Sequence, residues 1–167
     1  MNKSNELFDS FTGKGTVTKK LIDKSTGKVV EESTDHNLIV KAGRSAMINM
    51  LAGKLQSSVK KMAVGCKGTA DLGVNAFTPI KPEDGDTALK EQKGMVEVAS
   101  REPKLTETNP QVTFVALFDC ATVDSLVNEC GLFFEDGQTM FARHTFDTVS
   151  LKSTSNFSLE ISWTIEF

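Results

Sequence analysis

Histidine, cysteine and paired carboxylates are the residues with which a small soluble chain most readily does chemistry. The sequence of 167 residues contains two histidines, His36 and His144, and three cysteines. Neither histidine is accompanied by residues at the spacing of metal ligands, and Cys66, Cys120 and Cys130 form no C-x-x-C pair. We therefore expect structural histidines, no metal or other cofactor, and buried, inert thiols at positions 120 and 130.

Acidic residues offer one enzymatic alternative. A hydrolase of cell-wall polymer would need a carboxylate pair or a metal site, and Glu129 and Asp136 are the nearest acidic candidates. Both fit structural roles better, Glu129 before the apolar run GLFF and Asp136 in the turn EDGQ. GCKG at 65–68 lacks the spacing and the Lys-Ser/Thr ending of a phosphate-binding loop. We expect the protein not to be an enzyme and retain the hydrolase as an alternative.

The elements that would position these residues are mostly strands. Strand-like patterns occur at 59–65, 94–101, 111–118, 129–134, 139–149 and 156–167. EDGQ at 135–138 predicts a tight hairpin turn, and Gly27 predicts another within a hairpin over 14–33. These signals predict a mainly β protein, built as an antiparallel β-sandwich or a flattened barrel.

Two segments depart from the strand pattern. Between 42 and 53, one helical face collects apolar residues, namely Ala46, Met47, Met50 and Leu51. Gly53 is a suitable helix stop, so we predict one helix at about 42–53 that packs on the sheets, with its methionines as core filler. Asp86 is able to cap a short second helix over 87–92.

The segment 156–167, NFSLEISWTIEF, alternates apolar and polar residues throughout. Successive side chains of a strand point to opposite faces, so this strand has one dry face and one polar face. We expect other copies to cover its apolar face and edge, because an uncovered edge invites unwanted pairing. The assembly contacts predicted here are Phe157, Trp163 and Phe167.

Residues 1–13 are interpreted as an N-terminal arm and residues 14–167 as a single β-rich domain. The arm is polar apart from its first residue and three large apolar residues, Leu7, Phe8 and Phe11. A frayed terminus is one interpretation of this composition. Anchoring of the arm to a neighbour by these three residues is the other, and the sequence leaves both open.

Composition excludes several classes of partner. No apolar run approaches 18 residues and the first residues lack the pattern of a signal peptide, so we expect no membrane and synthesis in a cytoplasm. The net charge is −3, and the lysines and arginines do not form the dense clusters of a nucleic-acid interface. The chain has no tyrosine and one tryptophan, which does not favour sugar binding.

Five stretches, taken in order, resemble one family. They are HNLIVKAGRSAMINMLAG (36–53), MAVGCKGT (62–69), GDTALKEQ (85–92), NECGLFFEDGQTMFARHTFD (128–147) and ISWTIEF (161–167). In this order they are similar to small structural proteins of tailed bacteriophages, particularly tail-fibre and baseplate-associated proteins. Within the fourth stretch, Glu129 and Arg143 predict a cross-strand charge pair. A pair of this kind contributes about 0.2–1 kcal/mol, which matters for strand register more than for stability.

The resemblance implies a virion protein of the tail, baseplate or collar that joins or anchors tail fibres through protein–protein contacts. Its expected partners are other virion structural proteins and further copies of itself. Phage appendages of this kind are often trimeric, so a homotrimer is expected. Decoration of the capsid (head) is the alternative position on the virion, and the sequence does not separate the two.

Overall fold

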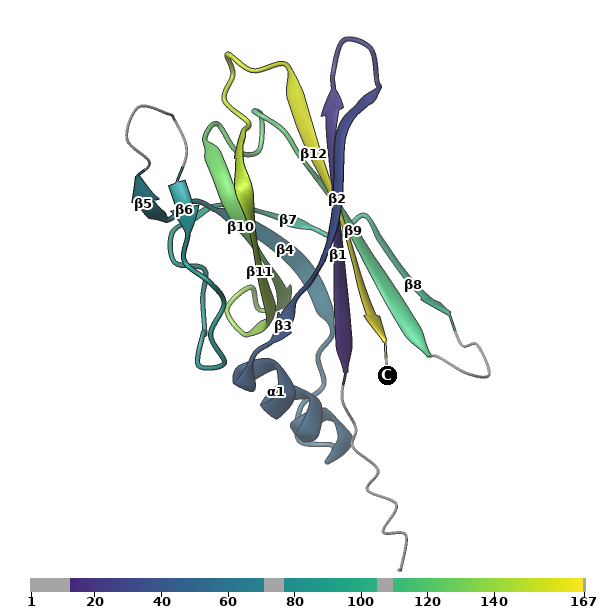
Figure 1. Ribbon diagram of the computed structural model, residues 1–167. Coiled ribbons are helices and arrows are strands. Elements are labelled where there is room, and N and C mark those ends of the chain that lie inside the picture. Colours follow the sequence, from purple (N-terminus) through teal and green to yellow (C-terminus); the bar gives the residue numbers. More distant parts are fainter. Residues whose placement is uncertain (1–12, 71–76, 105–109, 167) are drawn as a thin grey trace, which may run out of the picture.

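Two five-stranded antiparallel sheets face each other in the computed structural model, which describes residues 13–70, 77–104 and 110–166 (Figure 1). The first sheet contains, in spatial order, β2 (Val29–His36), β1 (Lys14–Asp23), β12 (Phe157–Glu166), β9 (Gln111–Phe118) and β8 (Ser100–Lys104). The second contains β3 (Leu38–Ile39), β11 (Met140–Ser150), β10 (Leu126–Phe134), β4 (Val59–Gly65) and β7 (Gln92–Glu97). A short ribbon is formed by β5 (Gly68–Ala70) and β6 (Phe77–Pro79). The predicted mainly β, antiparallel architecture is confirmed, and its two layers make it a β-sandwich.

The hydrophobic core lies between the inner faces of the two sheets. Strand β12 contributes four side chains that are at most 1% exposed, namely Leu159, Ile161, Trp163 and Ile165. They belong to one cluster with residues of the second sheet such as Leu132 and Ala142. The alternation predicted for this strand is therefore confirmed, because the residues between these four are on average more exposed.

Strand β12 is the middle strand of the first sheet. Its Trp163 is in register with Val17 of β1 on one side and with Phe114 of β9 on the other. Both edges of β12 are thus paired within the chain, and its apolar face is covered by the chain's own second sheet. The expectation that other copies cover this strand is corrected by these pairings, since neither edge of β12 is left open between residues 159 and 166.

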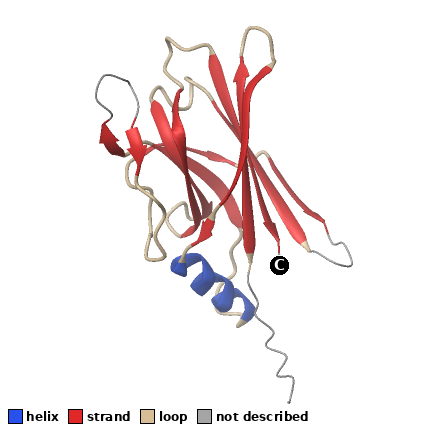
Figure 2. Cartoon of the chain, viewed as in Figure 1, coloured by secondary structure: helices blue, strands red, loops and turns tan. Residues whose placement is uncertain are grey.

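A helix, α1 (Lys41–Leu51), lies at the end of the sandwich where β1 begins (Figure 2). It confirms the helix predicted at about 42–53. Gly53 has a φ of +68°, the left-handed conformation that commonly ends a helix. A Cβ atom on Gly43 would lie 2.2 Å from the backbone oxygen of Phe141 in β11. Only glycine therefore lets the helix approach this strand so closely.

The second short helix predicted over 87–92 does not form. The backbone N–H groups of Lys90 and Glu91 donate to the carboxylate of Glu129, over 3.1 and 2.9 Å. In a helix, the same groups would donate to carbonyl oxygens of the preceding turn, so the two arrangements exclude each other. Asp86, expected as the cap of this helix, instead accepts a hydrogen bond from the Lys90 side chain.

The strand predicted at 94–101 is in fact divided between the two sheets. Strand β7 pairs with β4 in the second sheet, and β8 pairs with β9 in the first. The chain crosses at Val98 and Ala99, whose N–H groups donate to the carbonyls of Lys60 in β4 and Val115 in β9. No glycine or proline stands at this crossing, so the sequence carries no turn signal that would reveal it.

Candidate functional site, an apolar cleft at the helix end

The two histidines are held by the fold and line a polar cleft of about 650 Å³. Nδ1 of His144 lies 3.1 Å from the carbonyl oxygen of His36, and His144 is 7% exposed. Burial lowers the pKa of His144, so the neutral ring donates its Nδ1 proton to that carbonyl at neutral pH. Among the described residues, no group of three His, Cys, Asp or Glu side chains is placed to hold a metal ion.

The three cysteines differ in their accessibility. Cys66 and Cys130 are buried, and burial raises the pKa of both thiols, which keeps them protonated. Cys120 was expected to be buried but is half-buried, with its Sγ 3.6 Å from Nζ of Lys24. Its place in the segment after β9 explains the difference, because this segment leaves the core at Phe118.

Glu129, Arg143 and Asp86 form a buried charged cluster on the second sheet. The side chains of Glu129 and Arg143 are each 1% exposed, and that of Asp86 is 4% exposed. Nη2 and Nε of Arg143 donate to Oε2 of Glu129 over 2.6 and 3.0 Å, and Nη1 donates to Oδ2 of Asp86 over 2.9 Å. The predicted pair is confirmed, and the structure adds Asp86 and nearly complete burial.

The contacts of the two carboxylates considered for hydrolysis are structural. Glu129 accepts four hydrogen bonds, two from Arg143 and two from the backbone before β7. Asp136 lies in the β10–β11 turn and accepts hydrogen bonds from the backbone N–H groups of Gln138 and Thr139, both over 2.9 Å. The hydroxyl of Thr139 also donates to it and lowers the pKa of Asp136. Both carboxylates therefore fix the β10–β11 hairpin and its surroundings.

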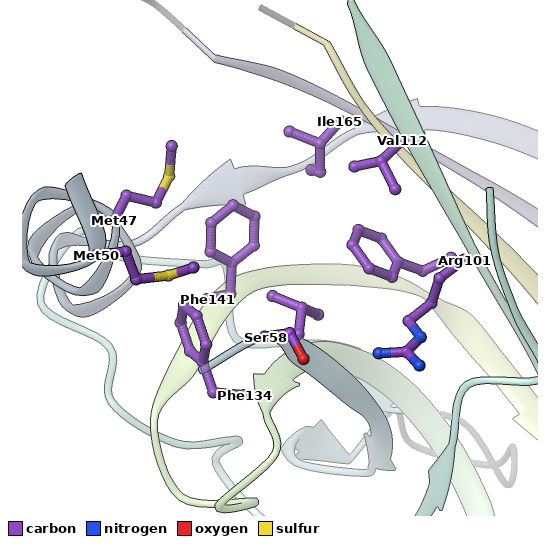
Figure 3. A pocket seen from close by; sticks show the side chains of 10 residues that line it. Met47, Met50, Ser58, Arg101, Val112, Phe134, Phe141 and Ile165 are labelled. Carbon is purple, nitrogen blue, oxygen red and sulfur yellow. The ribbon is translucent and has the colours of Figure 1, made fainter. Parts of the chain in front are cut away.

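An apolar cleft of about 450 Å³ opens between the two sheets beside α1 (Figure 3). It is lined by Met47, Met50, Ser58, Val59, Arg101, Val112, Phe114, Phe134, Phe141 and Ile165. Clefts that bind ligands in proteins have volumes of about 300–1,000 Å³, so this one is large enough for bulky apolar groups. It is the strongest candidate for a binding site among the described residues, because eight of its ten lining residues are apolar.

Each wall of the cleft comes from a different part of the fold. The methionines come from α1, and Figure 3 shows Arg101 and Val112 on the opposite side, from β8 and β9. Phe134 and Phe141 lie between these walls, on β10 and β11, with ring centroids 6.0 Å apart in an edge-to-face arrangement. These two aromatic side chains are only 2% and 5% exposed, so they form the closed floor of the cleft, and α1 and the first sheet form its sides.

The outward face of α1 extends the apolar surface beyond the cleft. Ile48 is 65% exposed and Leu51 is 79% exposed, while Met50, which lines the cleft, is 38% exposed. Residues three apart are neighbours on a helix, so Ile48 and Leu51 form one patch, called here the α1 patch. The prediction that one apolar face of the helix packs on the sheets is therefore partly wrong, because Ala46 packs in the core but Leu51 does not.

The predicted assembly contacts fall into three groups. Leu7, Phe8, Phe11 and Phe167 lie outside the described residues. Trp163 is fully buried in the chain's own core, so its side chain has no surface left for a contact with another molecule. Phe157 is half-buried at the start of β12, and its assembly role stays a prediction.

Sequence reasoning missed the residues of the cleft. Met47 and Met50 were interpreted as core filler, and no local pattern distinguishes a core methionine from one that lines a cleft. Arg101 carried no signal at all.

The part of the chain that the structure describes has no helix long and apolar enough to cross a membrane. Comparison of the chain with models of protein families, with curated proteins and with solved structures finds no match.

Proposed function

We propose that this protein is a structural component of a tailed-phage virion, in the tail, baseplate or collar, that joins or anchors tail fibres by binding other proteins. The observation that carries the proposal is the apolar cleft with the α1 patch beside it. Soluble proteins seldom leave adjoining apolar groups uncovered unless another molecule binds there. The ordered phage-like motifs between 36 and 167 support the choice of protein class.

The energetics favour a partner that fills the cleft as well as covering the helix. Burial of a large aliphatic side chain contributes about 1.5–3 kcal/mol, so the exposed fractions of Ile48, Met50 and Leu51 together would contribute roughly 3–5 kcal/mol. Association itself costs an estimated 4–15 kcal/mol. These three side chains alone are therefore insufficient, and insertion of apolar groups into the cleft has to supply the rest. The proposed partners are other virion proteins and further copies of this chain, assembled as a trimer.

Antibody labelling of purified virus particles tests this proposal. Particles of the virus that encodes this chain are purified and imaged by electron microscopy with a gold-labelled antibody against the protein. Label on the tail is expected. Label on the head would replace the proposal by capsid decoration, and a protein abundant in the lysate but absent from particles would overturn it.

A pair of matched variants connects the result to the cleft. Met50→Glu places a charge at the cleft, whereas Leu117→Glu makes the same kind of change at an apolar residue that is 53% exposed on β9 and does not line the cleft. We expect Met50→Glu to reduce incorporation into particles at least tenfold and Leu117→Glu to leave it unchanged. Equal incorporation of both variants would show that the cleft is not the docking site.

A further inference from the structure

The N-terminal arm joins the described part of the chain close to the cleft. Strand β1 starts at Lys14, and its second residue, Gly15, is in register with Ile165, which lines the cleft. Ile165 in turn is in register with Val112, another lining residue. The twelve residues that precede the described part of the chain are therefore attached one strand away from the cleft's wall.

The direction of β1 disfavours insertion of an arm into its own cleft. The lining residues Ile165, Val112 and Phe114 are level with Gly15 and Val17 of β1. A segment that continues β1 backwards from Lys14 leads away from that level, by about 3.3 Å per residue. Entry of its own apolar residues would require the chain to reverse its direction between them and Lys14, whereas the cleft of a second molecule can be reached without a reversal.

The composition of the arm matches the cleft. Leu7, Phe8 and Phe11 are large apolar residues within a polar segment, MNKSNELFDSFTG, and two acidic residues, Glu6 and Asp9, flank the Leu-Phe pair. The cleft offers methionine, phenylalanine and aliphatic walls, with Arg101 as its one charged lining residue. Arg101 is exposed and forms no ion pair with any described residue. The cleft thus provides an apolar surface for the three large apolar residues of the arm and a positive charge for the acidic residues beside the Leu-Phe pair.

We propose that the cleft binds Leu7, Phe8 and Phe11 from the N-terminal arm of a second copy of this chain, with Arg101 beside the acidic residues of that arm. This inference rests on the proposed function, because it names the first partner of the same cleft. Each molecule provides an arm for one neighbour and a cleft for another, so the same contact, when repeated, links successive copies. A closed ring or a reciprocal dimer results if the geometry closes.

A complementation experiment tests the inference on full-length protein. The arm variant Leu7→Ser/Phe8→Ser/Phe11→Ser retains the cleft, and the cleft variant Met50→Glu retains the arm. Light scattering measures the mass of each variant alone and of their equimolar mixture. The wild type is expected to be a dimer or larger, each variant alone a monomer, and the mixture a one-to-one heterodimer held by one intact contact. Leu117→Glu serves as the control and should associate like the wild type.

The other outcomes overturn the inference. A mixture that stays monomeric while the wild type associates would show that the arm and the cleft are not partners, and a monomeric wild type would exclude exchange between copies. In the second case, tail labelling of particles would still support the proposed function, so the two failures are distinguishable. Arg101→Glu is expected to weaken association about two- to fivefold, as for an exposed ion pair, and Asp9→Lys in the same chain should restore it.

Discussion

Replacing Glu129 with glutamine tests whether the buried cluster holds the β10–β11 hairpin to the segment before β7. The change keeps the side-chain size but removes the negative charge and introduces an amide NH₂ group where four hydrogen bonds are accepted. Arg143, whose side chain is 1% exposed, is then left with Asp86 as its only carboxylate partner among the described residues. Removal of one partner from a buried ion pair costs about 3–5 kcal/mol, and we expect the free energy of unfolding to fall by that amount.

The matched control is an exposed ion pair on the same sheet. Nζ of Lys60 contacts the carboxylate of Glu135, and their side chains are 40% and 44% exposed. Water and salt screen such a pair, which contributes at most about 1 kcal/mol. Glu135→Gln is therefore expected to have little effect, and the difference between the two substitutions isolates the contribution of burial.

Urea denaturation followed by tryptophan fluorescence measures both variants. Trp163 is the only tryptophan and is fully buried, so its emission reports loss of the core. With a denaturant dependence of about 1–3 kcal/mol per molar urea, a loss of 3–5 kcal/mol lowers the midpoint by roughly 2 M. If Glu129→Gln lowers the midpoint no more than Glu135→Gln, the burial of the cluster does not stabilise the fold.

Three further predictions concern the surroundings of the cluster, the helix and the thiols. The pKa of Asp86 lies below its ordinary 3.8, because the hydrogen bonds that its carboxylate accepts outweigh burial. The ionised carboxylate of Asp86 therefore stabilises the fold fully above pH 3.8, and this stabilisation is lost as the pH falls through the folded-state pKa. At neutral pH, Asp86→Asn should unfold at a lower urea concentration than the wild type. This difference in stability should close as the pH falls below 3.8. Gly43→Ala should cost about 1–3 kcal/mol in thermal unfolding, because its Cβ would meet the Phe141 backbone, whereas Gly85→Ala, which has open space, should be neutral. A thiol reagent should modify Cys120 first in the native protein, and prompt reaction of the two buried thiols would contradict their burial.

Local signals in the sequence were sufficient for the hairpins and for the end of the helix. Gly27, Gly53 and Gly137 all have positive φ angles, and each stands where a turn or helix stop was predicted. In these cases one residue type is required by the backbone conformation itself, and no distant contact takes part. The alternation of β12 was equally informative, because burial of one face of a strand follows from the period of its side chains.

Predictions that depended on distant residues were incomplete or wrong. The helix expected at 87–92 was displaced by hydrogen bonds to Glu129, which lies 38 residues after Glu91. The Glu129–Arg143 pair was recognised, but its burial and its third partner come from the folding of separate segments onto β10 and β11. The cleft combines side chains from α1 and several strands, so no window of the sequence contains it.

The central position of β12 also affects how the protein folds as it is synthesised. Its partner β1 ends at Asp23, while β12 begins at Phe157, so the ribosome adds more than 130 residues between them. At about 5–20 residues per second, that gap lasts roughly 7–30 s. During this time β1 has one unpaired edge, which is a template for aggregation. Strand β1 includes Lys14, Lys19 and Lys20, and lysines on an open edge oppose pairing with other nascent chains. These lysines thus protect the unfinished protein, although in the finished one only Lys14 and Lys20 stay at least partly exposed, while Lys19 becomes buried beside Glu31.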